Sequence, residues 1–224
     1  IFNPDGLEVA ACGNGSRCVA YLISTENKER YKNLPIYVKL KAGKRILEAT
    51  VPVPYSRIVK INMGIPKFNN WNDIPLENER LNPKILEIDF LKKEYGTGIC
   101  VNIGNPHIIF FVKNCWNVDI KKIGPKVENH HFFPERVNVT FAQLVDKENI
   151  KINVWERGAG QTKACGTAAC ATVVVAYLKD LANNFCDIHF KNVKESLGIL
   201  YDHKVGQVDM TGSVSEIKKI KVNI

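Results

Sequence analysis

Residues 165–178 read CGTAACATVVVAYL, a run in which nearly every side chain is small or apolar. Residues 12–24 read CGNGSRCVAYLIS and share two features with that run, a Cys-Gly start and a later Ala-Tyr-Leu. A helix that is apolar on most faces is typical of an interior and not of a surface. We therefore expect buried helices over 15–24 and 167–181, and an internal duplication that relates the two halves of the chain.

The rest of the chain consists mainly of short β-rich runs separated by turn residues. Such runs recur at intervals of about ten residues, a spacing typical of β layers that close or nearly close. Each half is therefore expected to wrap its strands around one buried helix. The expected strands are 36–40, 45–53, 58–63, 85–90, 100–103, 107–112, 136–144, 150–156, 186–191, 196–201 and 207–211.

Composition excludes several classes of protein. The 224 residues are 45% hydrophobic and 24% charged, as in ordinary globular chains. No apolar stretch approaches the ~18–20 residues of a membrane span, and no signal peptide begins the chain, so we expect a cytoplasmic protein without a membrane partner. The net charge is +8, but the lysines are scattered singly or in pairs, which argues against a nucleic-acid partner.

Seven cysteines in a chain without a secretion signal indicate reduced thiols and not disulfides. No Cys-x-x-Cys occurs and the five histidines do not fall at ligand spacing, so no metal site is expected. The first residues, Ile1-Phe2-Asn3-Pro4-Asp5-Gly6, have the pattern of a strand end running into a turn. We accordingly expect the chain to be a fragment that lacks an upstream segment.

The chemistry of the chain centres on Cys12 and Cys165, which each precede a glycine at an expected helix start. Unpaired N–H groups and the positive end of the helix dipole lower the pKa of a thiol there and favour the thiolate. The same N–H groups can hold a substrate carboxylate. Either Cys-Gly alone is explained equally well as a tight turn before a core helix, but two copies in matching contexts favour function.

At these residues the sequence resembles the diaminopimelate epimerase family. The resemblance rests on motifs that follow the family's order along the whole chain. They are Asn3-Pro4-Asp5-Gly6 with Cys12-Gly13-Asn14-Gly15-Ser16-Arg17-Cys18, then Gly104-Asn105-Pro106-His107, Phe133-Pro134-Glu135-Arg136-Val137-Asn138-Val139, Trp155-Glu156-Arg157-Gly158-Ala159-Gly160-Gln161-Thr162 and Ala164-Cys165-Gly166-Thr167.

The resemblance implies an isomerase that interconverts LL- and meso-diaminopimelate without a cofactor, on the route to lysine and cell-wall precursors. It also implies an α+β fold of two similar lobes of curled, mostly antiparallel sheet, each around a central helix, with the site between the lobes. Inverting an α-carbon requires one group to remove a proton and another to deliver one on the opposite face. Cys12 and Cys165 are assigned as this thiolate and thiol pair.

The resemblance carries further site residues over one position at a time. Gly13, Asn14, Gly166 and Thr167 match donors around the reacting carboxylate, and Asn3, Asn105, Asn138 and Arg157 match positions that bind substrate. A guanidinium is the natural bidentate partner of a distal carboxylate. Glu156 matches an acid that also faces substrate, and His107 matches an auxiliary catalytic group near the thiols.

The implied division places residues 1–65 and 211–224 in an incomplete N-terminal lobe with Cys12, and residues 66–210 in a C-terminal lobe with Cys165. Two departures from the family pattern stand out. Ala168 replaces a glycine, which adds a methyl group close to the amides that a ligand must approach. Lys218-Lys219-Ile220 replaces a Tyr-Asp-Gly associated with the dimer contact in some members, which leaves homodimerisation open.

Two alternative functions also fit the sequence. A racemase of proline or hydroxyproline would share the two-thiol chemistry, although a monocarboxylate has no use for Arg157 and the asparagines. A truncated, inactive relative would keep only the fold and the cleft. Intact Cys12 and Cys165 argue against that second alternative, whereas Ala168 and the truncation argue for it.

Overall fold

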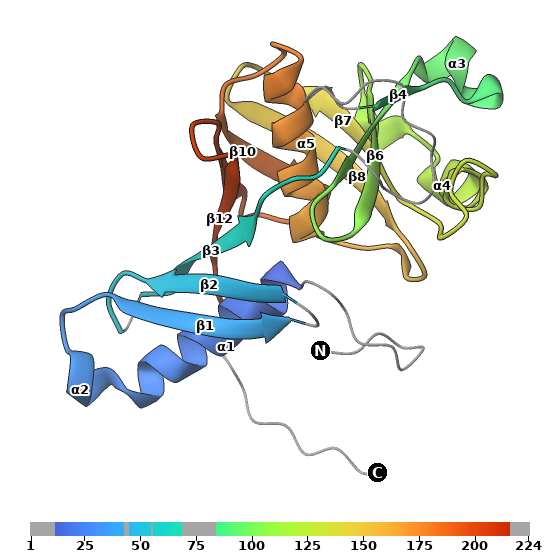
Figure 1. Ribbon diagram of the computed structural model, residues 1–224. Coiled ribbons are helices and arrows are strands. Elements are labelled where there is room, and N and C mark those ends of the chain that lie inside the picture. Colours follow the sequence, from blue (N-terminus) through green and yellow to red (C-terminus); the bar gives the residue numbers. More distant parts are fainter. Residues whose placement is uncertain (1–11, 43–44, 55, 69–83, 216–224) are drawn as a thin grey trace, which may run out of the picture.

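The computed structural model describes residues 12–42, 45–54, 56–68 and 84–215 (Figure 1). Its helices are α1 (Gly13–Glu26), α2 (Lys28–Tyr31), α3 (Asp89–Tyr95), α4 (Ile120–Glu128) and α5 (Gly166–Leu178), with a short 3₁₀ turn at Cys115–Asn117. Its strands are β1 (Ile36–Ala42), β2 (Arg45–Val51), β3 (Ile58–Gly64), β4 (Lys84–Leu86), β5 (Gly98–Asn102), β6 (Pro106–Phe111), β7 (Asn138–Leu144), β8 (Asn149–Glu156), β9 (Gly160–Gln161), β10 (Phe185–Phe190), β11 (Leu197–Asp202) and β12 (Gln207–Ser213).

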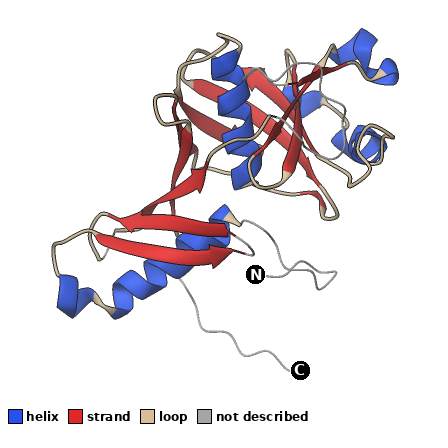
Figure 2. Cartoon of the chain, viewed as in Figure 1, coloured by secondary structure: helices blue, strands red, loops and turns tan. Residues whose placement is uncertain are grey.

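These strands form one curved sheet that runs through two lobes (Figure 2). The order is β1-β2-β3-β12-β11-β10-β8-β7-β6-β5-β4, and β9 pairs with β8. Among the described strands, only β6 with β7 and β8 with β10 pair in parallel. The expected α+β class with a curled, mostly antiparallel sheet is confirmed. The pairing of β3 with β12 connects the smaller lobe, of α1, α2, β1 and β2, to the larger lobe around α5 (Figure 1).

Helix α5 lies in the interior of the larger lobe, where it packs against β5, β6, β7, β10, β11 and β12. All eleven residues from Gly166 to Ala176 are buried. Small and β-branched side chains let strands approach the helix from several sides, because none of them projects far from its axis. The expectation of a helix buried on all faces is therefore confirmed for this segment.

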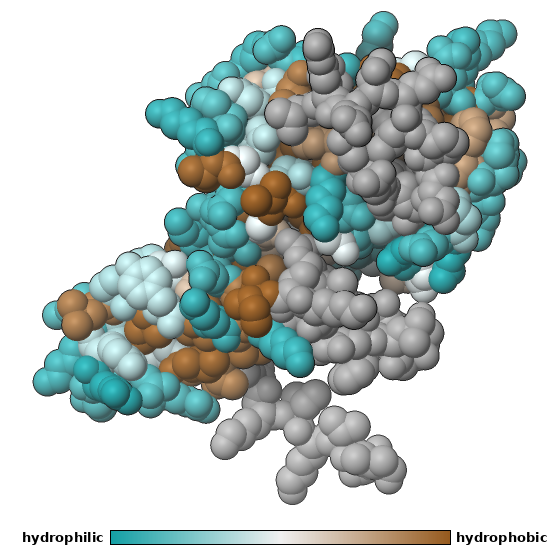
Figure 3. All heavy atoms as spheres, in the orientation of Figure 1, coloured by the Kyte–Doolittle hydropathy of each residue, from teal (hydrophilic) through white to brown (hydrophobic). Residues whose placement is uncertain are grey.

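Helix α1 differs from that expectation, because only one of its faces is buried. Its buried residues recur three or four positions apart, as one helical stripe requires. That stripe packs on β1, β2 and β3, whereas Val19 and Leu22 are 41% and 42% exposed. Hydrophobic residues appear on the surface of the smaller lobe in this view (Figure 3). Burial of α1 on all faces was a wrong prediction, since the three described strands lie on one side of it.

Two further segments differ from the sequence expectations. The strand expected over 85–90 ends at Leu86, and helix α3 begins at Asp89 instead. An acidic side chain in the first turn stabilises a helix through its dipole. Helix α4 was not expected at all, because Pro125 interrupts its pattern. Its buried positions nevertheless follow a helical spacing, at Ile120, Gly124, Val127 and Glu128.

Two apolar cores support these elements. One extends through both lobes, from Ala20 of α1 to Ala169 of α5. The other lies beneath α3 and α4 and includes Phe110 and Phe141, whose rings stack with centroids 5.2 Å apart. Within the described residues, no helix is long and apolar enough to cross a membrane. The second core fixes α4 against the end of β8, the strand that ends at the expected site residue Glu156.

Candidate active site

The starts of α1 and α5 meet at the junction of the lobes. Cys12 and Cys165 are the N-caps of the two helices, and both have extended backbones. A Cβ built on Gly166 would lie 3.9 Å from Cα of Gly13, so the two backbones are nearly in contact. Met210 of β12 packs against both glycines, and a side chain at either position would collide with it. The sequence therefore places glycine where two helix starts must approach closely.

A polar contact also joins the two helix starts. Asn14 Nδ2 lies 3.5 Å from the carbonyl oxygen of Ala164, which is the residue before Cys165. Asn14 Oδ1 accepts a hydrogen bond of 2.9 Å from Arg17 Nη2. Arg17 is only 7% exposed, and burial lowers the pKa of its guanidinium. A buried arginine thus orients the asparagine that connects α1 to the segment leading into α5.

A chain of polar side chains ends at the thiol of Cys165. The Cys165 sulfur and Thr167 Oγ1 are 3.3 Å apart, and either atom can donate. Asn105 Nδ2 lies 3.3 Å from the same hydroxyl oxygen, and His107 Nε2 lies 2.9 Å from Asn105 Oδ1. Because Asn105 donates to Thr167, the threonine hydroxyl hydrogen is free to point at the sulfur.

The electrostatics of these groups differ from the sequence expectation. Burial raises the pKa of the Cys165 thiol well above its ordinary value, and the neighbouring Glu156 carboxylate raises it further. The helix start was expected to lower this pKa, and for Cys165 that expectation is wrong, because desolvation and Glu156 outweigh the hydrogen bonds of Thr167 and the Ala168 backbone. Burial also lowers the pKa of His107 to about 3, with Arg157 contributing, so this imidazole is neutral at pH 7.

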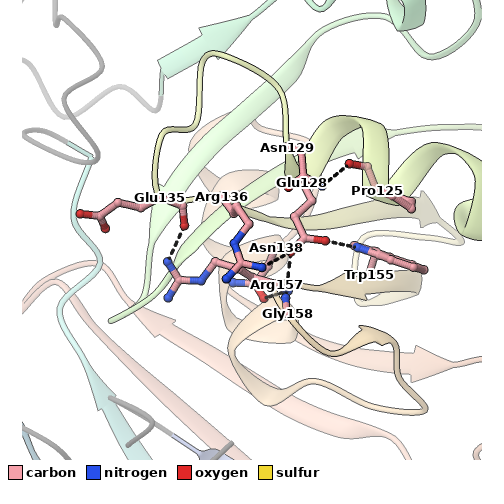
Figure 4. A network of polar contacts seen from close by, with 9 residues as sticks. All are labelled: Pro125, Glu128, Asn129, Glu135, Arg136, Asn138, Trp155, Arg157 and Gly158. Atoms are coloured by element: carbon pink, nitrogen blue, oxygen red, sulfur yellow. Dashed lines mark hydrogen bonds and ion pairs between the residues drawn. The ribbon is translucent and has the colours of Figure 1, made fainter. Parts of the chain in front are cut away.

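Glu156 is the last residue of β8, and Arg157 begins the turn that leads to β9. The Thr162 hydroxyl donates to Glu156 Oε1. Arg157 is held at both ends, since its backbone N–H donates to Asn138 Oδ1 at 3.0 Å and its Nη1 donates to the carbonyl of Glu135 at 3.0 Å (Figure 4). Asn138 is 3% exposed, and its Nδ2 donates to the carbonyl of Pro106 at 2.7 Å.

Comparison with known proteins identifies the family. The diaminopimelate epimerase family profile matches residues 99–216. A diaminopimelate epimerase of Pelagibacter ubique is 44% identical over the whole of this chain, which covers 78% of that protein. One from Acetivibrio thermocellus is 35% identical with the same two coverages. The chain belongs to the diaminopimelate epimerase family.

Solved structures similar to this family member show the same fold at low identity. A probable proline racemase from Agrobacterium radiobacter has a TM-score of 0.68 and 12% identity, over 99% of this chain and 70% of that one. A hydroxyproline epimerase from Agrobacterium vitis has a TM-score of 0.63, also at 12% identity, over 94% of this chain and 65% of that one. At such identities the likeness concerns the fold alone.

The structure gathers most of the expected site residues of this family member. Gly13, Asn14 and Gly166 lie at the helix junction. Thr167 and Glu156 act directly on Cys165, and Asn105 and His107 are connected to it through Thr167. Asn138 pairs with His107 across β6 and β7, which brings Arg157 to the same end of the sheet. Asn3 and the segment Lys218-Lys219-Ile220 lie outside the described residues. The Ala168 methyl group is fully buried in the core.

Sequence reasoning missed three residues at this site. Met210 packs against both glycines, Thr162 contacts Glu156, and Glu128 contacts the backbone beside Arg157. Thr162 ended a quoted motif, and Met210 belongs to a Met210-Thr211-Gly212 that matches the family pattern, but neither was assigned to the site. Glu128 gave no signal, because its contacts are distant along the chain. Within the described part of the chain, no group of three or more His, Cys, Asp or Glu could hold a metal ion.

Proposed function

We propose that this protein is a two-base epimerase that interconverts LL- and meso-diaminopimelate through Cys12 and Cys165. The observation that carries the proposal is the meeting of the two Cys-Gly helix starts, 153 residues apart in sequence, with their glycines almost in contact. Two thiols on opposing helix starts can act on opposite faces of one α-carbon. The first-turn N–H groups of both helices would then stabilise the charge that develops on the α-carboxylate.

The two thiols have different surroundings, and this suggests how the proton is held. Cys165 is 5% exposed and its pKa is raised, so it starts as the thiol that delivers a proton. Cys12 is half-buried, and its sulfur accepts a hydrogen bond of 3.4 Å from the Gly15 amide, a contact suited to a thiolate. Cys12 would remove the α-proton in that direction, and the roles would exchange in the reverse reaction.

Thr167 fits both states of Cys165. Its oxygen can accept from the thiol, and its hydroxyl hydrogen can donate to the thiolate that remains after proton delivery. Asn105 orients this hydroxyl, and neutral His107 orients Asn105, so His107 acts as a positioning residue and not as a direct proton donor. Arg157 would bind the distal carboxylate of the substrate.

Deuterium uptake tests the proposal directly. The full chain is incubated in heavy water with LL-diaminopimelate and, separately, with L-proline, and loss of the α-proton signal is followed by NMR. Uptake with diaminopimelate but not proline is expected, and Cys12→Ala and Cys165→Ala should each lower it by at least ~100-fold. Uptake with proline alone would favour the racemase alternative, and no uptake with either substrate would favour the inactive one.

A further inference from the structure

Glu128 is the last residue of α4, and its buried carboxylate faces the end of β8 and the turn that follows, near Trp155, Arg157 and Gly158 (Figure 4). Its Oε2 accepts a 2.7 Å hydrogen bond from the Trp155 indole Nε1, and its Oε1 accepts a 2.8 Å hydrogen bond from the backbone N–H of Gly158. Trp155 and Gly158 flank Glu156 and Arg157 in sequence. One carboxylate therefore holds both sides of the segment that bears two expected site residues.

The packing of α4 brings this carboxylate into place. Gly124, one turn before Glu128, lies against the Trp155 ring, and a Cβ there would come within 2.6 Å of Trp155 Cδ2. Helix α4 can therefore approach the indole only because residue 124 lacks a side chain. The Glu128 side chain is 7% exposed as a result, and its hydrogen bonds are shielded from water.

An ion pair with Arg136 does not explain the burial of Glu128. Arg136 Nη1 is 3.5 Å from Glu128 Oε1, and the Arg136 side chain is half exposed. Exposed ion pairs of this length contribute little to stability. Two short hydrogen bonds to a buried carboxylate are stronger, and they fix the directions of the groups that donate them. The position of the Glu128 carboxylate is therefore set by its hydrogen bonds to Trp155 and Gly158.

We infer that Glu128 is a positioning residue for substrate binding, which holds the segment 155–158 so that Arg157 is set to receive the distal carboxylate. This inference rests on the proposed function. Asn138 fixes the Arg157 amide and Glu128 fixes the next amide along, at Gly158, so the two side chains act on consecutive peptide groups. Glu156 is held separately by Thr162, so loss of Glu128 should affect binding more than turnover.

The test measures KM and kcat for diaminopimelate in three variants of the full chain. Glu128→Leu removes both acceptors, and KM should rise about tenfold, as expected when a buried donor loses its partner, while kcat falls less than threefold. Glu128→Gln keeps one acceptor and should give a smaller rise. Glu135→Gln is the matched control, because Glu135 is exposed, its hydrogen bond to Arg157 comes from the backbone carbonyl, and its carboxylate adds only an electrostatic interaction. KM should stay within twofold in this variant.

Several outcomes would overturn the inference. The first is a folded Glu128→Leu variant with an unchanged KM. The second is a rise in KM in Glu135→Gln as large as that in Glu128→Leu, since loss of a negative charge near Arg157 would then explain both. If Glu128→Leu does not fold, the KM of Glu128→Gln decides instead. Partial unfolding of that variant would lower its apparent kcat but leave its KM unchanged, so a rise in KM still reports on substrate binding. If the wild-type chain does not act on diaminopimelate, the proposed function fails, and hydrogen exchange over residues 155–163 decides the positioning role instead. Faster exchange in Glu128→Gln than in Glu135→Gln supports it, and equal exchange refutes it.

Discussion

Replacing Thr167 by valine removes the hydroxyl that joins Asn105 to Cys165 and leaves the shape of the side chain almost unchanged. The 3.3 Å contact between this hydroxyl and the sulfur becomes charge-assisted whenever Cys165 is a thiolate. Hydrogen bonds to charged groups contribute about 1.5–3 kcal/mol, which corresponds to a rate loss of about 10- to 150-fold. The substitution also deprives half-buried Asn105 of an acceptor, at a cost of about 1 kcal/mol in unfolding free energy.

The assay follows loss of the α-proton signal of diaminopimelate in heavy water, with urea unfolding measured in parallel. Thr172→Val provides the matched control, because Thr172 is a buried threonine of the same helix whose hydroxyl donates only to the Ala168 carbonyl, at 2.8 Å. The control should keep its turnover within twofold. If Thr167→Val also keeps wild-type turnover, the hydroxyl does not serve the thiolate and the proposed role of Cys165 loses its support.

Three further predictions concern the same junction. Because the folded protein holds His107 neutral with a pKa of about 3, against 6.5 when unfolded, its contribution to stability is present above pH 6.5 and is lost as pH falls towards 3. Between pH 6.5 and pH 3 the free energy of unfolding should therefore drop by up to about 1.4 kcal/mol per pH unit. Urea titrations should show a steeper drop for the wild-type protein than for His107→Gln. Gly13→Ala should lower the free energy of unfolding by about 1–3 kcal/mol, because the new methyl group overlaps with the end of the Met210 side chain. In thermal melts, adding Met210→Leu should recover part of that loss. If the effects of the two substitutions simply add, the packing of Met210 on Gly13 is contradicted. Iodoacetamide at pH 8 should label half-buried Cys12 before Cys165, and mass spectrometry showing the reverse order would contradict the assigned thiol state.

Local pattern predicted the parts of this fold that depend on local chemistry. The apolar run after Gly166 indicated an interior helix, and the repeated Cys-Gly indicated that α1 and α5 begin alike. Pattern could not predict that one face of α1 stays exposed, because burial depends on how many strands surround a helix. Nor could it predict α4, where Pro125 interrupts a spacing that the packing of Gly124 on Trp155 nevertheless stabilises.

The site shows the same division between local and long-range information. Motifs located Cys165, Thr167 and Asn105, and the structure adds how they are connected. The pKa of Cys165 could not be predicted from its position at a helix start, because the sign depends on desolvation and on Glu156. Glu128 contacts residues about 30 positions further along the chain, so no short motif contains both partners.

The position of β12 in the sheet has a consequence for how the protein is made. This strand lies between β3 and β11, yet it is the last described strand to leave the ribosome. Until it emerges, β3 has an unpaired edge, which is the kind of edge that recruits other chains. Met210, which packs against both glycines, belongs to that same strand. Synthesis of nearly the whole chain must therefore precede assembly of the two-cysteine junction, and a nascent chain stalled before residue 207 would display two separate helix starts and no site.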